Sequence, residues 1–161
     1  MTEIRQIDIT DSDATDVERI ENRMVGRALS HWDDLRGDRN FPTYEDYSAQ
    51  ETPYGDEHVF VISIRDSELS DEIVAAGQKV EEGFGRSPVG LKAIEAIPSS
   101  IEKGLSFCRT AARMKKPIAD VGHFSNANGT EICYRSILLP LSSDQINVDH
   151  ILGAFSFKVM E

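Results

Sequence analysis

Few side chains in this chain of 161 residues have the types and spacing that chemistry requires. Cys108 and Cys133 are far apart and belong to no C-x-x-C pair, so neither a disulfide framework nor a zinc site is indicated. The sequence also contains no G-x-S-x-G, H-E-x-x-H or phosphate-loop motif. The acidic doublets Asp33-Asp34, Asp71-Glu72 and Glu81-Glu82 are interpreted as solvated charge, because adjacent side chains diverge on a helix or strand. We therefore expect a protein that is not an enzyme.

The charge balance restricts the partners. Acidic residues outnumber basic ones by 28 to 17, and the formal net charge is −11. Such a charge repels phosphate backbones and anionic membrane surfaces, so we expect no nucleic-acid partner. Arg109, Arg113, Lys115 and Lys116 are interpreted as basic side chains that complement a helix dipole. Residues 1–10 lack the apolar region of a signal peptide, and no run approaches the roughly 20 apolar residues of a membrane span, so we expect a cytoplasmic protein without membrane insertion.

Two segments have the apolar periodicity of amphipathic helices. The first begins with a cap at Asp11 or Ser12 and ends at Gly37. The second opens at Pro98-Ser99 and ends before Pro117. Residues 38–54, which contain prolines and have no sustained period, are predicted to form an irregular connector.

Five segments are predicted to be strands. The run from His58 to Arg65 is rich in β-branched and aromatic residues, and Ile73–Gly77 is a shorter candidate. Three further runs, residues 118–124, 130–139 and 148–160, follow the second helix. Asn128-Gly129 between the first two of these runs predicts a hairpin, because both residues tolerate positive φ.

This order of elements predicts an α+β fold: a five-stranded antiparallel sheet with helices on one face, preceded by an N-terminal amphipathic helix. We divide the chain into a tail (1–10), the N-terminal helix and connector (11–54) and the core (55–161). In the last strand, Leu152 and Ala154 alternate with the apolar residues Ile151 and Phe155. The side that carries Leu152 and Ala154 is semi-polar, and we expect it to be accessible to a partner.

Several stretches resemble PAS domains, in particular the alphaproteobacterial type that occurs as small free-standing bacterial proteins. They are WDDLRGDR at 32–39 followed by Pro42, FGRSPVG at 84–90, YRSILLPLS at 134–142 and HILG at 150–153. The resemblance covers most of residues 28–158. It implies a sensory and regulatory module in signal transduction that contacts signalling proteins and forms a homodimer through the N-terminal helix. The alternative is a haem- or metabolite-binding sensor, and a small enzyme is a third option.

PAS domains hold ligands between the sheet and the helices. On this resemblance, the candidate pocket residues are Ile62, Phe84, Ile94, Leu105, Tyr134 and Phe155. A flavin photoreceptor needs a reactive cysteine in the region of short helices, and residues 78–96 contain none. Haem needs an axial histidine, and His31, His58, His123 and His150 all lie outside the second long helix. At those positions a hydrogen-bonded or exposed imidazole is commoner than a ligand, and His123 is the one we retain as a candidate. The cofactor is left open.

Trp32, Arg36 and Arg39 form the most prominent cluster for a partner contact. Tryptophan and arginine are enriched among interface hot spots, so these residues are candidates for partner binding. Alternatively, Trp32 packs against the sheet and the two arginines fix the connector by hydrogen bonds to backbone carbonyls, because an amphipathic stripe normally faces the core.

Overall fold

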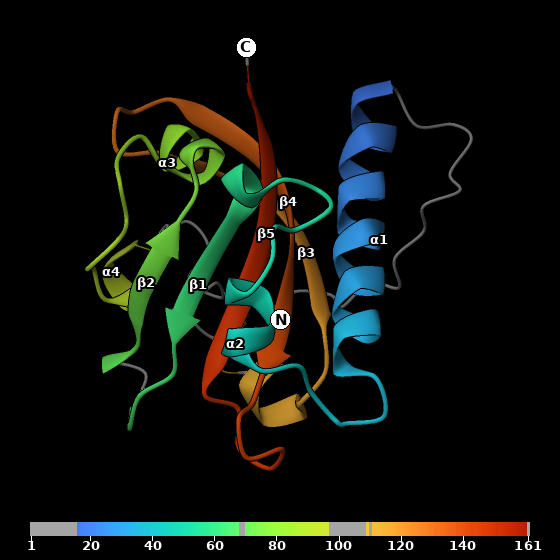
Figure 1. Ribbon diagram of the computed structural model, residues 1–161. Coiled ribbons are helices and arrows are strands. Elements are labelled where there is room, and N and C mark those ends of the chain that lie inside the picture. Colours follow the sequence, from blue (N-terminus) through green and yellow to red (C-terminus); the bar gives the residue numbers. More distant parts are fainter. Residues whose placement is uncertain (1–15, 68–69, 97–108, 110, 161) are drawn as a thin grey trace.

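A five-stranded antiparallel sheet forms the centre of the computed structural model (Figure 1). The structure describes residues 16–67, 70–96, 109 and 111–160. The strand order is β2-β1-β5-β4-β3. The strands are β1 (Val59–Ser63), β2 (Glu72–Ala76), β3 (Ile118–Ser125), β4 (Glu131–Leu141) and β5 (His150–Val159). All five predicted strands are present, and the prediction of an antiparallel α+β sheet is confirmed.

One face of the sheet, here called the inner face, is covered by short helices. They are α3 (Gln78–Phe84) and α4 (Ala93–Ala96), and the 3-10 turn η1 (Asp56–His58) precedes β1. Arg109 and residues 111–114 are helical, which agrees with the predicted helix end before Pro117; the rest of that helix lies outside the described residues. The buried core on this side includes Ile62, Ile73, Val80, Phe84, Ile118, Phe124, Tyr134, Ile151 and Phe155.

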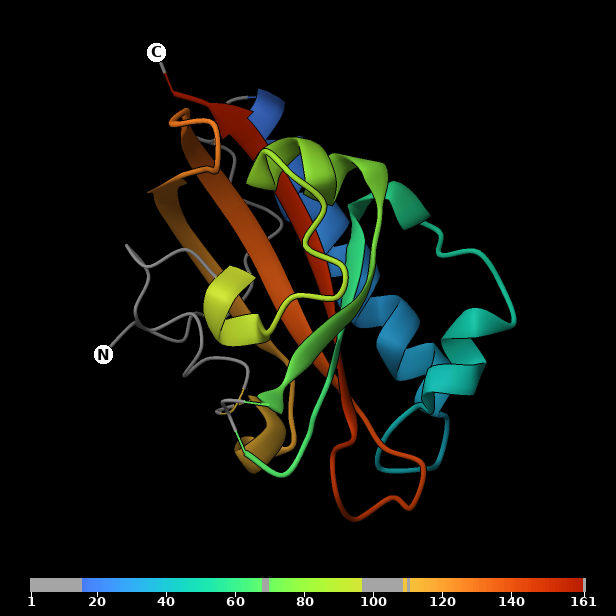
Figure 2. The same cartoon turned by 90° about the vertical axis from the view of Figure 1, so that its left-hand side faces the viewer.

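The other face, here called the outer face, carries α1 (Asp16–Arg36) and α2 (Tyr44–Ser48). Figure 2 shows α1 and α4 on opposite sides of the sheet. The second core cluster contains Met24, Val25, Ala28 and Trp32 of α1, with Ile137, Leu139, Leu152 and Ala154 of the sheet. The expectation that the side of β5 with Leu152 and Ala154 is accessible is therefore wrong, because the apolar stripe of α1 covers it. The predicted helix start at Asp11 or Ser12 lies outside the described residues.

The turn between β3 and β4 lies where Asn128-Gly129 predicted it, but its geometry differs. Gly129 has φ +80°, whereas Asn128 is not among the residues with positive φ. Asn126 organises the turn instead: its Oδ1 accepts hydrogen bonds from the backbone nitrogens of Asn128 (2.9 Å) and Thr130 (3.0 Å). The loop is thus closed by an Asn side chain and one left-handed glycine.

Pro140 lies inside β4, two residues beyond the last residue of β3's pairing register, Ile118 opposite Leu138. Proline lacks the backbone N–H that a strand with partners on both sides would use, so this position suits it. Its carbonyl accepts a hydrogen bond from Trp32 Nε1 at 2.8 Å. The Pro140 carbonyl, at the point where β4 extends beyond its pairing with β3, therefore anchors α1 to the sheet.

The connector after α1 is more regular than predicted. α1 ends at Arg36, and Gly37 follows with φ +58°, as expected for a helix stop. Thr43 and Asp46 then form a reciprocal capping box that starts α2. This one-and-a-half-turn helix holds Tyr44 and Tyr47 over the outer face of the sheet.

Candidate functional site

The predicted inner pocket is in large part a packed aromatic core. Ile62, Phe84, Tyr134 and Phe155 belong to one buried cluster. The ring centroids of Phe84 and Phe155 are 5.5 Å apart, and those of Tyr134 and Phe155 are 5.8 Å apart, which are ordinary packing distances. The side chain of Ile94 and all of Leu105 lie outside the described residues. A ligand at these positions stays a prediction.

A polar pair lies within this core. Tyr134 donates a hydrogen bond from its hydroxyl to Asp120 Oδ2 at 2.6 Å, and Asp120 is 8% exposed. Burial raises the pKa of Asp120, although the hydrogen bonds from Tyr134 and from the Val121 backbone oppose the shift. Burial, the hydrogen bond to Asp120 and its charge also raise the pKa of Tyr134. This pair was not predicted from the sequence, although Asp120 lies two residues after the buried Ile118 and so shares its face of β3.

The arrangement of Trp32, Arg36 and Arg39 agrees with the second interpretation, in which Trp32 packs against the sheet and the arginines fix the connector. Trp32 is buried and bonded to the Pro140 carbonyl, and the Arg36 guanidinium lies 5.6 Å from the centre of the indole ring. Arg39 Nη2 donates to the Leu35 carbonyl at 2.7 Å and to Asp46 Oδ2 at 2.6 Å. These bonds fix the connector against the end of α1. Both arginines remain partly exposed, so a partner contact through them stays a prediction.

Asp71 is a buried anion that the sequence analysis interpreted as solvated. It is 0% exposed, and its carboxylate accepts hydrogen bonds from Arg109 Nε (2.7 Å), Arg109 Nη2 (2.6 Å) and the Arg65 backbone nitrogen (2.7 Å). Its neighbour Glu72 pairs instead with Lys92 at 3.4 Å. The interpretation was therefore wrong for Asp71, whereas Asp33 and Asp34 are exposed as expected. Arg109, interpreted as a helix-end charge, instead ties its helix to the segment that joins β1 and β2.

The histidines do not converge on a metal or haem site. Within the part of the chain that the structure describes, no three His, Cys, Asp or Glu side chains group to hold a metal ion. His58 Nδ1 lies 3.1 Å from the Phe155 carbonyl, and His150 Nδ1 lies 2.7 Å from Asp149 Oδ1. His123 is exposed and alternates with the buried Phe124, so it faces away from the inner core. This geometry removes His123 as a ligand inside that core. The expectation that His31 is hydrogen-bonded or exposed is wrong, because the side chain is buried (9% exposed) and neither ring nitrogen has a hydrogen-bond partner among the described residues.

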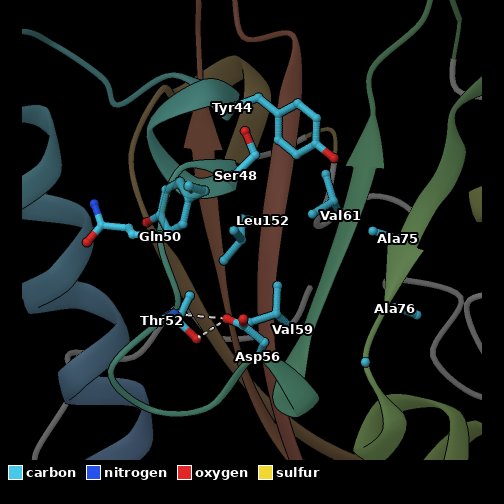
Figure 3. Close-up of a pocket in the computed structure, with 12 residues that line it drawn as sticks. Tyr44, Ser48, Gln50, Thr52, Asp56, Val59, Val61, Ala75, Ala76 and Leu152 are labelled. Atoms are coloured by element: carbon cyan, nitrogen blue, oxygen red, sulfur yellow. Dashed lines mark hydrogen bonds between the residues drawn. The ribbon is translucent and has the colours of Figure 1, made fainter.

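A cleft of about 380 Å³ lies on the outer face, between α2 and the strands β1 and β2 (Figure 3). None of the six predicted pocket residues lines it. The lining residues are Tyr44, Tyr47, Ser48, Gln50, Thr52, Asp56, Val59, Val61, Ala75, Ala76, Gly77 and Leu152. No local sequence pattern indicates this cleft, because it forms where the connector crosses two strands that follow it in the chain.

Comparisons with known proteins identify the fold. No protein-family model and no curated protein matches the chain. The blue-light photoreceptor Aureochrome1 LOV domain, in its light state, aligns with a TM-score of 0.52 and 16% identity over 66% of this chain and 84% of that one. A PAS domain from Colwellia psychrerythraea aligns with a TM-score of 0.50 and 15% identity over 61% and 82%. The chain spans 57% of the LOV protein of Rhodobacter sphaeroides, at 14% identity and a TM-score of 0.49.

The chain has the PAS fold, which confirms the fold implied by the sequence resemblance. Hairpin β1–β2, short helices and meander β3–β4–β5 follow one another in the order from which the resemblance was inferred. The segment Gln78–Ala96 contains no cysteine, and the identity of any cofactor stays open. No helix in the described ranges has the length and apolar character to cross a membrane.

Proposed function

We propose that the chain is a regulatory PAS module that acts in signal transduction through contacts with itself and with signalling proteins, and that it catalyses no reaction. The fold supports a sensory role, since the structural neighbours include a domain named as a blue-light photoreceptor. Fold alone does not assign a function, so the proposal depends on a surface of this chain. That surface is the exposed side of α1.

The exposed side of α1 has self-complementary charge, and this observation carries the proposal. A stripe at helical spacing runs through Arg23, Gly26, Arg27, Ser30, Asp33 and Asp34, and all except the half-buried Gly26 are exposed. Its basic side chains precede Ser30 and its acidic side chains follow it. Two copies of α1 packed antiparallel about Ser30 would place Arg27 of each copy opposite Asp33 and Asp34 of the other. A two-fold contact requires such a surface, which complements itself.

The residues at the centre of the stripe have small side chains, which favours close approach of two helices. Gly26 and Ser30 lie one turn apart at the centre, so no large side chain separates the two helix axes. Asp33 also pairs with Arg36 of its own helix at 2.6 Å, which leaves Asp34 as the principal partner for Arg27 of a second copy. The contact therefore depends on a small number of charged groups that mutation can reverse.

The opposite side of α1 connects this contact to the sheet. Met24, Val25, Ala28 and Trp32 are buried against β4 and β5. A change in the position of those strands would shift α1 and so change the surface offered to a partner. A signal that favours one position over the other would alter the population of the dimer, as in other two-state regulatory elements.

Native mass spectrometry of the purified chain, with light scattering at several concentrations, tests this proposal. We expect a dimer whose dissociation constant rises about tenfold or more in the variant Arg27→Glu, because the two symmetry-related Arg27–Asp34 contacts become repulsive. The double variant Arg27→Glu/Asp34→Arg reverses both charges and should restore dimerisation. Arg86→Glu, an exposed arginine beyond α3, is the matched control and should have no effect. A monomeric wild type, or equal dimerisation in all four proteins, would refute the contact through α1.

A further inference from the structure

The outer-face cleft has an apolar floor and one aromatic wall. Val61 and Leu152 are buried at its floor, and Val59 and Ala75 are partly exposed there. Figure 3 shows Tyr44 reaching from α2 toward Val61. One face of the Tyr44 ring is covered by His150, whose ring stacks on it with centroids 4.6 Å apart. Tyr44 is therefore held as a fixed wall before any ligand enters.

The one charged side chain of the cleft, Asp56, lies at the opposite end from Tyr44 (Figure 3). Asp56 Oδ1 accepts hydrogen bonds from the backbone nitrogen of Thr52 (2.9 Å) and from its hydroxyl (2.8 Å), and this pair closes that end in Figure 3. Asp56 Oδ2 accepts no hydrogen bond from the described residues, which leaves a carboxylate oxygen available for a donor. The twelve lining residues include no lysine and no arginine, so the charge of the cleft is negative.

Buried polar side chains lie directly behind the cleft. The hydroxyls of Tyr47 and Tyr54 are buried and have no hydrogen-bond partner among the described residues. His31 packs edge-on against both rings, with centroid distances of 5.4 and 6.2 Å. Gln50, a cleft residue, approaches the His31 imidazole without reaching ordinary hydrogen-bond geometry. Native proteins retain few unpaired buried polar groups, and those that persist call for an explanation such as a ligand site.

We infer that this cleft binds a small, flat aromatic molecule that carries a protonated amine. Its volume of about 380 Å³ lies within the range of small-molecule sites. The aromatic ring packs on Val61 and Leu152 beside Tyr44. The amine donates to Asp56. An anionic ligand is disfavoured, because the cleft offers it no positive charge.

The site also reaches α1, which deepens the function proposed above. Tyr47 lines the cleft and touches His31, and His31 precedes the anchoring residue Trp32 on α1. A ligand that moves the Tyr47 ring changes the packing of His31 against α1. Only this coupling rests on the proposed function, because binding in the cleft is measured independently of the oligomeric state.

Three compounds with one ring system test the charge preference: tryptamine (a cation), tryptophol (neutral) and indole-3-acetate (an anion). Each is titrated into the ¹⁵N-labelled protein up to about 1 mM, where millimolar affinities are still detected. We expect tryptamine to shift the amide signals of Gln50, Thr52 and Gly77, and to bind about tenfold more tightly than indole-3-acetate. No shift at these amides with any compound, or equal affinity for the anion, would overturn the inference.

Three variants locate the site. Ala75→Phe fills the floor and should abolish tryptamine binding. Asp56→Asn keeps the acceptor for Thr52 but removes the charge, and it should weaken tryptamine binding about three- to tenfold. Glu57→Gln, the same change at the next residue and outside the cleft, should leave the affinity within about twofold. Unaltered binding in Ala75→Phe, with a thermal unfolding midpoint that shows the variant is folded, would place the ligand elsewhere and refute the assignment. A wild-type protein that is monomeric but still binds tryptamine would contradict the proposed function alone.

Discussion

Replacement of Arg109 by methionine removes the cation that neutralises the buried Asp71. The carboxylate of Asp71 is 0% exposed, and two of its three hydrogen bonds come from Arg109. In the variant, only the Arg65 backbone nitrogen, at 2.7 Å, still donates to it. Methionine retains a stem of about the length of the arginine side chain up to Nε, so the loss is mainly of charge and hydrogen bonds.

The magnitude follows from the burial of the pair. Removal of one partner of a buried ion pair costs about 3–5 kcal/mol, because the other charge is left uncompensated. The Arg109 side chain is 17% exposed, and solvent screening places the expected loss near the lower end, about 3 kcal/mol. For a chain of this length, such a loss lowers the unfolding midpoint by about 6–12 °C.

Urea unfolding followed by far-UV circular dichroism measures this loss. Arg113→Met is the matched control, since Arg113 is exposed and lies one helical turn later; it should change the free energy of unfolding by less than about 0.5 kcal/mol. The double variant Asp71→Asn/Arg109→Met should be more stable than Arg109→Met, because it removes the uncompensated charge. A loss below about 1 kcal/mol, or a loss equal to that of Arg113→Met, would refute the role assigned to the pair.

Two further predictions concern the anchor of α1 and the polar pair of the inner core. Trp32→Phe keeps an aromatic ring but loses the hydrogen bond to the Pro140 carbonyl. The free energy of unfolding should therefore fall by about 1–2 kcal/mol, and amide hydrogen exchange in α1 should accelerate. Unchanged exchange would contradict the anchoring role. Burial raises the pKa of Asp120 above its ordinary value of 3.8, so the folded state holds a proton that the unfolded state has lost, and the free energy of unfolding should fall as the pH rises through that window. Asp120→Asn should lack this fall in urea titrations between about pH 4 and 8, and identical pH profiles would show that Asp120 is not the group responsible.

The sheet was predictable because its strands carry local signals. Runs of β-branched residues and the Asn-Gly turn placed β1, β3, β4 and β5 within a few residues of their observed bounds. The coverage of the outer face was not predictable in the same way. Leu152 and Ala154 are small or ordinary apolar residues that suit a solvated or a covered face, and only the packing of α1 decides between the two.

The burial of Asp71 within the Asp71-Glu72 doublet was indicated by its distance from Ile73 in the sequence. Adjacent side chains diverge on a strand, but that rule does not say which of the two points inward. Asp71 lies two residues before Ile73, which is fully buried, so the strand period placed Asp71 and not Glu72 on the inner side. Its partner Arg109 is distant in sequence, and no local pattern indicated the pairing.

The outer-face cleft depends on contacts between segments that are far apart in the chain. Tyr44 and Tyr47 belong to residues 38–54, for which the sequence predicted only an irregular connector. Their positions over β1 and β5 follow from the capping box of Thr43 and Asp46 and from the Arg39–Asp46 ion pair, which sets the direction of α2. His31 belongs to the same group, because it is on the side of α1 that the connector covers.

A disulfide cross-link at the centre of α1 tests most directly whether this chain acts through a two-fold contact of that helix. In a Cys108→Ser/Cys133→Ser background, Ser30→Cys places one thiol at the proposed two-fold axis, where antiparallel helices bring equivalent residues within disulfide reach. We expect rapid formation of a covalent dimer on mild oxidation, while Ser87→Cys, an exposed position away from α1, stays monomeric. Cross-linking of Ser30→Cys no faster than that of Ser87→Cys would contradict the two-fold contact.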